Sequence, residues 1–167
     1  MSARKTYDGF ITKLEDNHVF VFGSNLQGFH GGGAAGFASF GIAGNNWRNI
    51  DYHKWPDGKK GKWNVKGVGK GFQEGTEGKS YALPTVTHAG ARRSIPLSEI
   101  RKNISELYEF AKANSHLEFF IAYTCANTNL NGYTDEEMAS VFSQPNIPLN
   151  IIFNKQFHTL VCYNSGF

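Results

Sequence analysis

The sequence predicts an α/β domain of three layers, α/β/α, whose central sheet is mixed but mostly parallel. Short, mostly apolar runs such as His18–Phe22 and Phe119–Thr124 are typical of strands that are buried on both faces of a sheet. Between these runs, Leu97–Asn114 places apolar residues at steps of three and four, which indicates a helix with one buried face. Strands that alternate with helices in this way are characteristic of α/β folds.

The composition indicates one globular domain spanning residues 1–167. Of the 167 residues, 40% are hydrophobic and 19% are charged, and the length suits a sizeable core. The formal net charge of +3 is too small to indicate nucleic-acid binding by itself. Cys125 and Cys162 are too few for a disulfide framework, so we expect a reduced, cytoplasmic setting. Residues 1–17 are polar and no apolar run approaches membrane-spanning length, so we expect neither a signal peptide nor a membrane partner.

Turn and capping residues divide the chain into elements. Glycine, asparagine and proline end the apolar runs, because glycine adopts conformations that other residues avoid and proline cannot continue a central strand. Thr134 followed by Glu137 forms a capping box, which begins a helix. The expected strands are Tyr7–Lys13, His18–Phe22, Ser80–Leu83 (ended by Pro84), Phe119–Thr124 and Asn150–Phe153; the expected helices are Gly33–Phe40, Leu97–Asn114 and Asp135–Phe142; a last apolar run is Leu160–Tyr163.

Residues 45–79 form a Gly/Lys-rich insertion, the most basic part of the chain. Trp55 and Trp63 lie among its lysines, such as Lys59 and Lys60. One hypothesis is a lid or a basic surface for phosphate or single-stranded nucleic acid, since lysines attract phosphates and aromatic rings stack on bases. The other is a solvated hairpin whose tryptophans cover an edge of the core. We favour the second, and expect the insertion to be more mobile than the core and dispensable for folding.

A glycine-rich loop after the first apolar strand predicts an anion-binding site. Asn25 follows the strand at its carboxyl end, where open α/β sheets bind ligands. Gly31, Gly32 and Gly33 then lead into a helix, and glycine backbone N–H groups together with a helix N-terminus attract phosphate. Their spacing excludes both the dinucleotide fingerprint and the P-loop. The alternative is a mobile turn between two core elements.

A second polar loop, from Cys125 to Tyr133, follows Phe119–Thr124 and precedes the capped helix. Strand, polar loop and helix therefore occur twice, and we expect both loops to face one cleft. Phe-Gly-Ser-Asn-Leu-x-Gly-x-His-Gly-x-Gly-Ala-Ala from Phe22 and Leu-Asn-Gly-Tyr-Thr-Asp-Glu-Glu-Met-Ala from Leu130 resemble the macrodomain superfamily. They look most like a branch of bacterial and phage macrodomain-like proteins, and the similarity spans most of residues 18–153, with the insertion and the tail outside it.

The resemblance implies a macrodomain-like fold that binds ADP-ribose or a related nucleotide diphosphate, free or on an ADP-ribosylated macromolecule. It places Asn25 on the ribose next to the nicotinamide position, the glycines around the diphosphate, and the second loop over the distal ribose and phosphate. Tyr133 is the ring expected to flank the ligand. The implied ligand-binding residues are Gly23, Ser24, Asn25, Gly31, Gly32, Gly33, Ala34, Thr128, Asn129, Leu130, Asn131, Gly132 and Tyr133. Relatives usually carry glycines where this chain has Asn127, Asn129 and Asn131, which leaves the ligand's identity open.

The catalytic chemistry stays open. Asn25 and His30 are the candidate catalytic residues, with His30 either a general base or a simple donor to phosphate. Binding and ADP-ribosyl hydrolysis use the same loops in macrodomains, so both remain candidates. The scattered histidines and the lone Cys125 predict no metal site, no cofactor and no thiol nucleophile. The alternative function is a single-stranded nucleic-acid or protein interaction module that uses the basic insertion.

Overall fold

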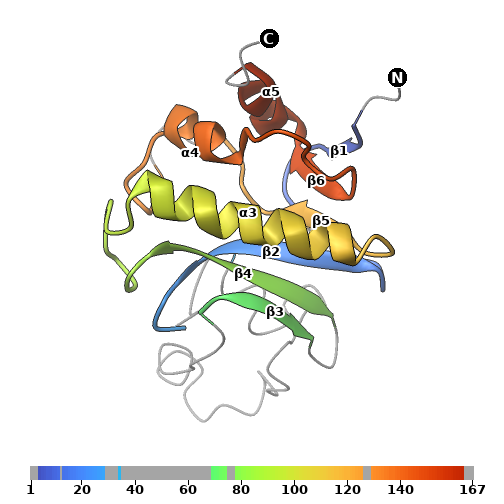
Figure 1. Cartoon of the computed structure of the whole chain (residues 1–167), viewed down its shortest axis with the longest axis horizontal. Coiled ribbons are helices and arrows are strands. Elements are labelled where there is room, and N and C mark those ends of the chain that lie inside the picture. Colours follow the sequence, from blue (N-terminus) through green and yellow to red (C-terminus); the bar gives the residue numbers. More distant parts are fainter. Residues whose placement is uncertain are drawn as a thin grey trace.

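The computed structural model describes residues 4–11, 13–28, 34, 69–74, 78–125 and 129–163. These residues form a six-stranded sheet in the order β1-β6-β5-β2-β4-β3, in which the β3–β4 pair is antiparallel and the other pairs are parallel (Figure 1). The predicted α/β class with a mostly parallel sheet is therefore confirmed. The strands are β1 (Thr6–Tyr7), β2 (His18–Asn25), β3 (Gly71–Glu74), β4 (Lys79–Val86), β5 (Glu118–Ile121) and β6 (Ile151–Asn154), and the helices are α3 (Leu97–Ala113), α4 (Asp135–Phe142) and α5 (Lys155–Tyr163).

The central strand β2 is buried on both faces, as its unbroken apolar run predicts. It pairs with β4 on one side and with β5 on the other. Successive side chains of a strand point to opposite faces. Val19 and Val21 accordingly belong to the core on one face, and Phe20 and Phe22 belong to a smaller cluster on the other.

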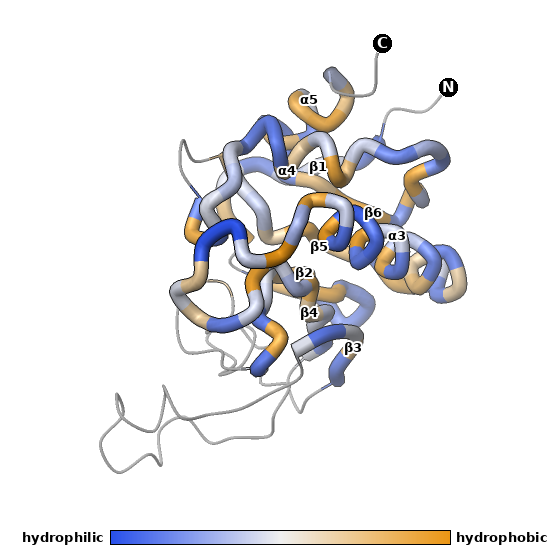
Figure 2. The backbone as a smooth tube through the Cα atoms, turned by 60° about the vertical axis from the view of Figure 1, so that its left-hand side comes forward, coloured by the Kyte–Doolittle hydropathy of each residue, from blue (hydrophilic) through white to orange (hydrophobic). Residues whose placement is uncertain are grey.

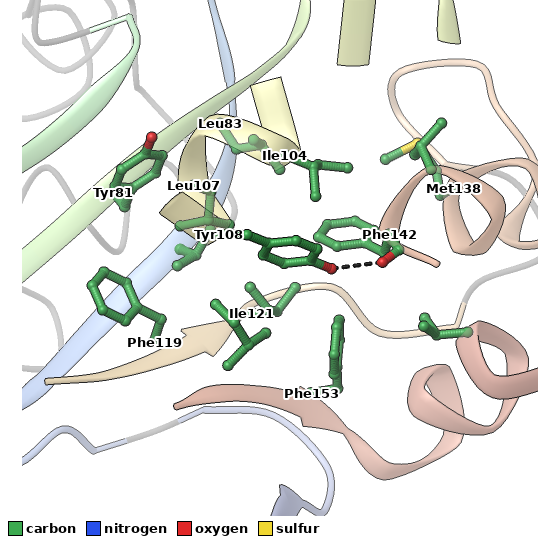
Figure 3. Packing of buried hydrophobic residues seen from close by; sticks show 14 of the residues in the cluster. Tyr81, Leu83, Ile104, Leu107, Tyr108, Phe119, Ile121, Met138, Phe142 and Phe153 are labelled. Carbon is green, nitrogen blue, oxygen red and sulfur yellow. Dashed lines mark hydrogen bonds between the residues drawn. The ribbon is translucent and has the colours of Figure 1, made fainter. Parts of the chain in front are cut away.

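Helices α3, α4 and α5 supply the main core on one face of the sheet (Figures 1 and 3). Figure 2 shows hydrophobic and hydrophilic residues alternating along α3, as the predicted periodicity of this helix requires. The hydroxyl of Tyr108 on α3 donates a hydrogen bond of 2.6 Å to the carbonyl of Phe142, the last residue of α4. Burial raises the pKa of Tyr108, so this donor stays protonated and joins the two helices.

The other face carries the smaller cluster of Phe20, Phe22 and Ala82. Ile11, Leu14 and Ala34 pack against it. Ala34 falls within the predicted helix Gly33–Phe40, whose other residues lie outside the described part of the chain. Helices α3, α4 and α5 therefore cover one face of the sheet. The second helical layer of the predicted α/β/α arrangement belongs on the opposite face, over this smaller cluster.

Several predicted strand boundaries are wrong. β2 continues to Asn25 instead of ending at Phe22, and β5 ends at Ile121 instead of Thr124. The strand expected over Tyr7–Lys13 is reduced to β1, because Gly9 adopts a φ of +66° and turns the chain away. β4 continues through Pro84 to Val86 instead of ending before it. Proline is tolerated there because the ladder is irregular: β3 pairs with β4 as far as Ala82, and the register between β2 and β4 shifts after Ser24.

The predicted insertion ends inside the sheet. Residues 45–68 and 75–77 lie outside the described part of the chain. Gly71–Glu74, however, form the edge strand β3, and Phe72 packs against Phe110 of α3 with ring centroids 5.3 Å apart. Part of the segment expected to be a solvated insertion therefore belongs to the sheet, and removing β3 would remove part of the core. The dispensability of the remainder stays a prediction.

The apolar run Leu160–Tyr163 is the end of a helix that the sequence analysis did not predict. α5 begins directly after β6, where the side-chain oxygen of Asn154 accepts hydrogen bonds from the backbone N–H groups of Gln156 (3.0 Å) and Phe157 (3.2 Å). An asparagine that accepts such bonds is a favourable helix start. None of the described helices is both long and apolar enough to cross a membrane.

Candidate functional site

The carboxyl ends of the parallel strands β2, β4 and β5 meet at one edge of the sheet. In the sheet, β4 lies on one side of β2, whereas the later strands β5 and β6 lie on its other side. The direction in which strands are added therefore switches between β2 and β5. Open α/β sheets bind ligands at such switch points. The segments that leave this edge are residues 26–28, the loop from 87 to 96, and the chain from 122 to 134.

The structure places the predicted residues Gly23, Ser24 and Asn25 at this edge. Asn25 ends β2 and is only 6% exposed. Its carbonyl accepts the N–H of Gly28 at 3.1 Å, which forms a turn, and the hydroxyl of Ser24 donates to the carbonyl of Gly69 at 2.6 Å. The turn and the Ser24 bond fix the end of β2, so Asn25 occupies a defined position.

A cavity of about 50 Å³ lies beside Gly23, an exposed residue in an otherwise buried strand. This volume holds a few water molecules but is too small for a nucleotide, so a nucleotide here would lie across the sheet edge. The hydroxyl of Tyr123 is buried and has no hydrogen-bond partner within the described residues, and burial raises its pKa. The lining residues are Val21, Phe22, Gly23, Leu83, Thr85, Ile121, Ala122, Tyr123, Asn131, Met138 and Phe142.

The second loop is folded by its own asparagine side chains. The amide nitrogen of Asn129 donates to the carbonyl of Tyr133 at 2.7 Å and to the carboxylate of Asp135 at 3.2 Å. The side-chain oxygen of Asn131 accepts the N–H of Tyr133 at 2.9 Å. Gly132, which lies between Asn131 and Tyr133, adopts a φ of +87°, a conformation that favours glycine. The side-chain amides of Asn129 and Asn131, which we expected to face a ligand, thus form hydrogen bonds inside the loop.

Tyr133 lies in the core instead of on the wall of a cleft, which corrects the expectation for its ring. It is 4% exposed, and its hydroxyl donates to the carbonyl of Ile95 at 2.5 Å. The neighbouring Leu130 has the opposite environment, because its side chain is 91% exposed at the tip of the loop. Of the two, Leu130 is the side chain that an approaching molecule can reach.

The remaining predicted site residues are only partly described. His30, Gly31, Gly32, Gly33 and Thr128 lie outside the described part of the chain. Ala34 packs against the smaller hydrophobic cluster. Within the described ranges no three His, Cys, Asp or Glu side chains gather as a metal site. Cys125 is partly buried against the core, and burial raises the pKa of its thiol.

Sequence reasoning missed Arg93, in the loop that follows β4. Its guanidinium forms two hydrogen bonds with the carboxylate of Glu137, at 2.9 and 3.0 Å, and lies 4.5 Å from the centre of the Tyr133 ring. The bonds from Arg93 and from the backbone of Thr134 lower the pKa of Glu137 to about 2. The adjacent pair Arg92-Arg93 was visible in the sequence, but no spacing indicated which arginine turns towards α4.

A scan against models of protein families and a search of curated proteins gave no match. Among solved structures, the fold is similar to that of a mutant form of the macrodomain from Oceanobacillus iheyensis. The TM-score is 0.50, the sequence identity is 17%, and the alignment covers 94% of this chain and 87% of that one. An identity this low concerns the fold alone, and the fold that it shows for this chain is macrodomain-like.

Proposed function

We propose, from the macrodomain-like fold and the arrangement of its sheet edge, that this protein binds ADP-ribose or a related nucleotide diphosphate. The observation that carries the proposal is the position of Asn25. It is a buried amide at the carboxyl end of the central strand, beside the switch point between β2 and β5. An asparagine amide can both donate and accept hydrogen bonds, which suits recognition of ribose hydroxyl groups.

The proposed ligand lies across the sheet edge between the two loops. Its diphosphate is bound by backbone N–H groups of Gly31–Ala34, and Asn25 contacts the adjoining ribose. This arrangement is supported by the departure of both loops from the same edge and by the exposure of Gly23 beside the cavity. Because Tyr133 is buried and Leu130 is exposed, we assign the second-loop contact to Leu130.

Free ADP-ribose and an ADP-ribosylated macromolecule present the same chemical group, so the proposal covers both. They are distinguished by comparing free ADP-ribose with a peptide that carries one ADP-ribose unit. Tighter binding of the modified peptide would indicate a macromolecular partner. Binding of the unmodified peptide would show that the peptide, and not ADP-ribose, is recognised.

Isothermal titration calorimetry tests the proposal with ADP-ribose, NAD, AMP and a short single-stranded oligonucleotide as ligands. Asn25→Ala should weaken ADP-ribose binding by about 1–3 kcal/mol, the cost of leaving a buried polar partner unsatisfied. Gly32→Val should abolish binding, because a side chain there occupies the space that the phosphate needs. Lys59→Ala and Lys60→Ala are the matched controls in the basic insertion and should change little.

Two results would overturn the proposal. One is the absence of heat and of thermal stabilisation with all three nucleotides while the protein is folded. The other is a larger loss from the lysine variants than from Gly32→Val, with the oligonucleotide as the preferred ligand. In that second case the basic insertion would be the binding surface and the function would be nucleic-acid binding.

A further inference from the structure

The segments that follow β4 and β5 are joined by Arg93. We infer that Arg93 is a positioning residue that holds residues 129–134 closed over the ligand site, an inference that rests on the proposed function. The group formed by Arg93, Gly132, Tyr133 and Glu137 is called the Arg93 latch. Arg93 itself touches no proposed ligand position, so its effect on binding would pass through the loop.

The latch combines several contacts from one side chain. The guanidinium donates to both carboxylate oxygens of Glu137 at 2.9 and 3.0 Å, and one nitrogen lies 3.4 Å from the carbonyl of Gly132. The same group lies over the ring of Tyr133, with 4.5 Å between its central carbon and the ring centre. A planar guanidinium satisfies such a fork and such a stacked position at once, which an ammonium group cannot do.

The backbone of the latch is shaped for close contact between the two segments. The N–H of Arg93 donates to the carbonyl of Asn131 at 2.6 Å. Arg93 has a φ of +50°, a conformation that is unfavourable for arginine, and Gly132 opposite has a φ of +87°. A Cβ at Gly132 would lie 3.0 Å from the Cβ of Arg92 and from the Cγ of Arg93. An unfavourable backbone conformation persists where surrounding contacts hold it, and here those contacts join two loops at the ligand edge.

The position of the latch argues for an effect on the site as well as on stability. It connects the loop after β4 to the loop after β5 across the topological switch point. Leu130, at the tip of the second loop, is 91% exposed, so packing of that tip contributes little to holding the loop in place. The hydrogen bond from the hydroxyl of Tyr133 to the carbonyl of Ile95 also joins these two segments. Loss of the guanidinium would therefore loosen the loop without unfolding the sheet.

Two neighbouring arginines provide matched controls. Arg92 is exposed and makes no ion pair among the described residues, so Arg92→Gln removes the same charge one position away. Arg101 on α3 donates to the carbonyls of Ser140 and Ser143 at 3.0 and 3.2 Å. Arg101→Gln thus weakens the attachment of the other end of α4 and leaves the latch intact.

The experiment measures three quantities for Arg93→Gln, Arg93→Lys, Arg92→Gln and Arg101→Gln. They are the ADP-ribose affinity by calorimetry, the free energy of unfolding by urea denaturation, and amide hydrogen exchange at Gly132 and Tyr133. These two amides bond inside the loop, to Asn129 and Asn131, so they report its opening directly. Exchange needs no ligand, so it tests the latch even if ADP-ribose does not bind.

We expect Arg93→Gln to weaken ADP-ribose binding about fivefold, because a looser loop is closed for a smaller fraction of the time. Exchange at both amides should speed up by more than this factor, because exchange follows the ratio of open to closed loop and not the closed fraction. Arg92→Gln and Arg101→Gln should each change the ADP-ribose affinity less than about twofold. This should hold even if Arg101→Gln lowers the free energy of unfolding as much as Arg93→Gln does. Arg93→Lys keeps the charge but loses the fork, so it should fall between wild type and Arg93→Gln.

Each other outcome is decisive. Unchanged exchange in Arg93→Gln would show that the latch does not hold the loop. Faster exchange with unchanged affinity would make Arg93 a stabilising residue only, and an equal loss in Arg92→Gln would assign the effect to charge. If Arg93→Gln does not fold, Arg93→Lys and Glu137→Gln decide by the same criteria. If wild type binds no ADP-ribose while exchange still rises in Arg93→Gln, the proposed function fails but the latch stands.

Discussion

Gly132 offers a test in which the cost of backbone conformation is separated from the cost of close packing. Its φ of +87° is matched by Gly90, which has a φ of +84°. The two glycines differ in their surroundings. A Cβ at Gly132 would lie 3.0 Å from side-chain atoms of Arg92 and Arg93 and 3.1 Å from the backbone nitrogen of Arg93, whereas at Gly90 nothing lies within 4 Å. We therefore predict that alanine is costly at both positions and more costly at Gly132.

The magnitudes follow from these two terms. A side chain in the left-handed region costs about 1–2 kcal/mol, and the smaller freedom of alanine in the unfolded chain offsets about 0.4–1 kcal/mol. Gly90→Ala should thus lower the free energy of unfolding by about 1 kcal/mol. Overpacking adds about 1–3 kcal/mol, so Gly132→Ala should lower it by about 2–4 kcal/mol.

Urea denaturation of wild type and both variants, followed by far-ultraviolet circular dichroism, measures the difference. The slope of the free energy with urea should be the same in the three proteins, because the surface exposed on unfolding is the same. Equal losses in Gly90→Ala and Gly132→Ala would refute the reasoning, since the close contact between Gly132 and the segment at Arg92–Arg93 would then carry no cost.

Two further predictions concern stability. Asn150→Ala should lower the free energy of unfolding by about 1–3 kcal/mol, because the amide nitrogen of Asn150 donates to the carbonyls of Ala111, Asn114 and Leu117 at 2.9, 3.3 and 3.0 Å; Asn150→Asp, which lacks the donor, should be at least as damaging in the same urea assay. The pKa of Glu137 is lowered to about 2 from 4.5. The contribution of the ionised Glu137 to the free energy of unfolding is therefore complete above pH 4.5 and is lost as the pH falls towards 2. Glu137→Gln should remove this part of the acid sensitivity, and thermal melts from pH 5 to pH 2 that decline equally in both proteins would contradict it.

The sheet could be predicted from the sequence because its strands carry their own signal. The apolar run at Val19–Phe22 needs both faces covered, and the capping box at Thr134 and Glu137 begins α4 as expected, with both of its hydrogen bonds formed. α5 was not predicted because its start depends on the side chain of Asn154, which accepts hydrogen bonds from two backbone N–H groups. In the sequence, Asn154 indicates only the end of the preceding strand.

The candidate site was predictable only where it coincides with a strand end. Asn25 could be placed because β2 fixes it, and its surroundings bear out its position at the sheet edge. The orientation of Tyr133 could not be predicted from the sequence, because the carbonyl that accepts the hydrogen bond from its hydroxyl belongs to Ile95, 38 residues away. Arg93 was missed for the same reason, since its partner Glu137 lies 44 residues further along the chain.

The pairing of β1 with β6 has a consequence for synthesis of the chain. Thr6 and Tyr7 lie beside Phe153 and Asn154, and the guanidinium of Arg4 donates to the carbonyls of Ile147, Pro148 and Ile151. The amino-terminal segment therefore finds its partners only after residues 147–154 have left the ribosome. Until then the strand β1 has no partner in the sheet. A strand from another chain could pair with it during this time.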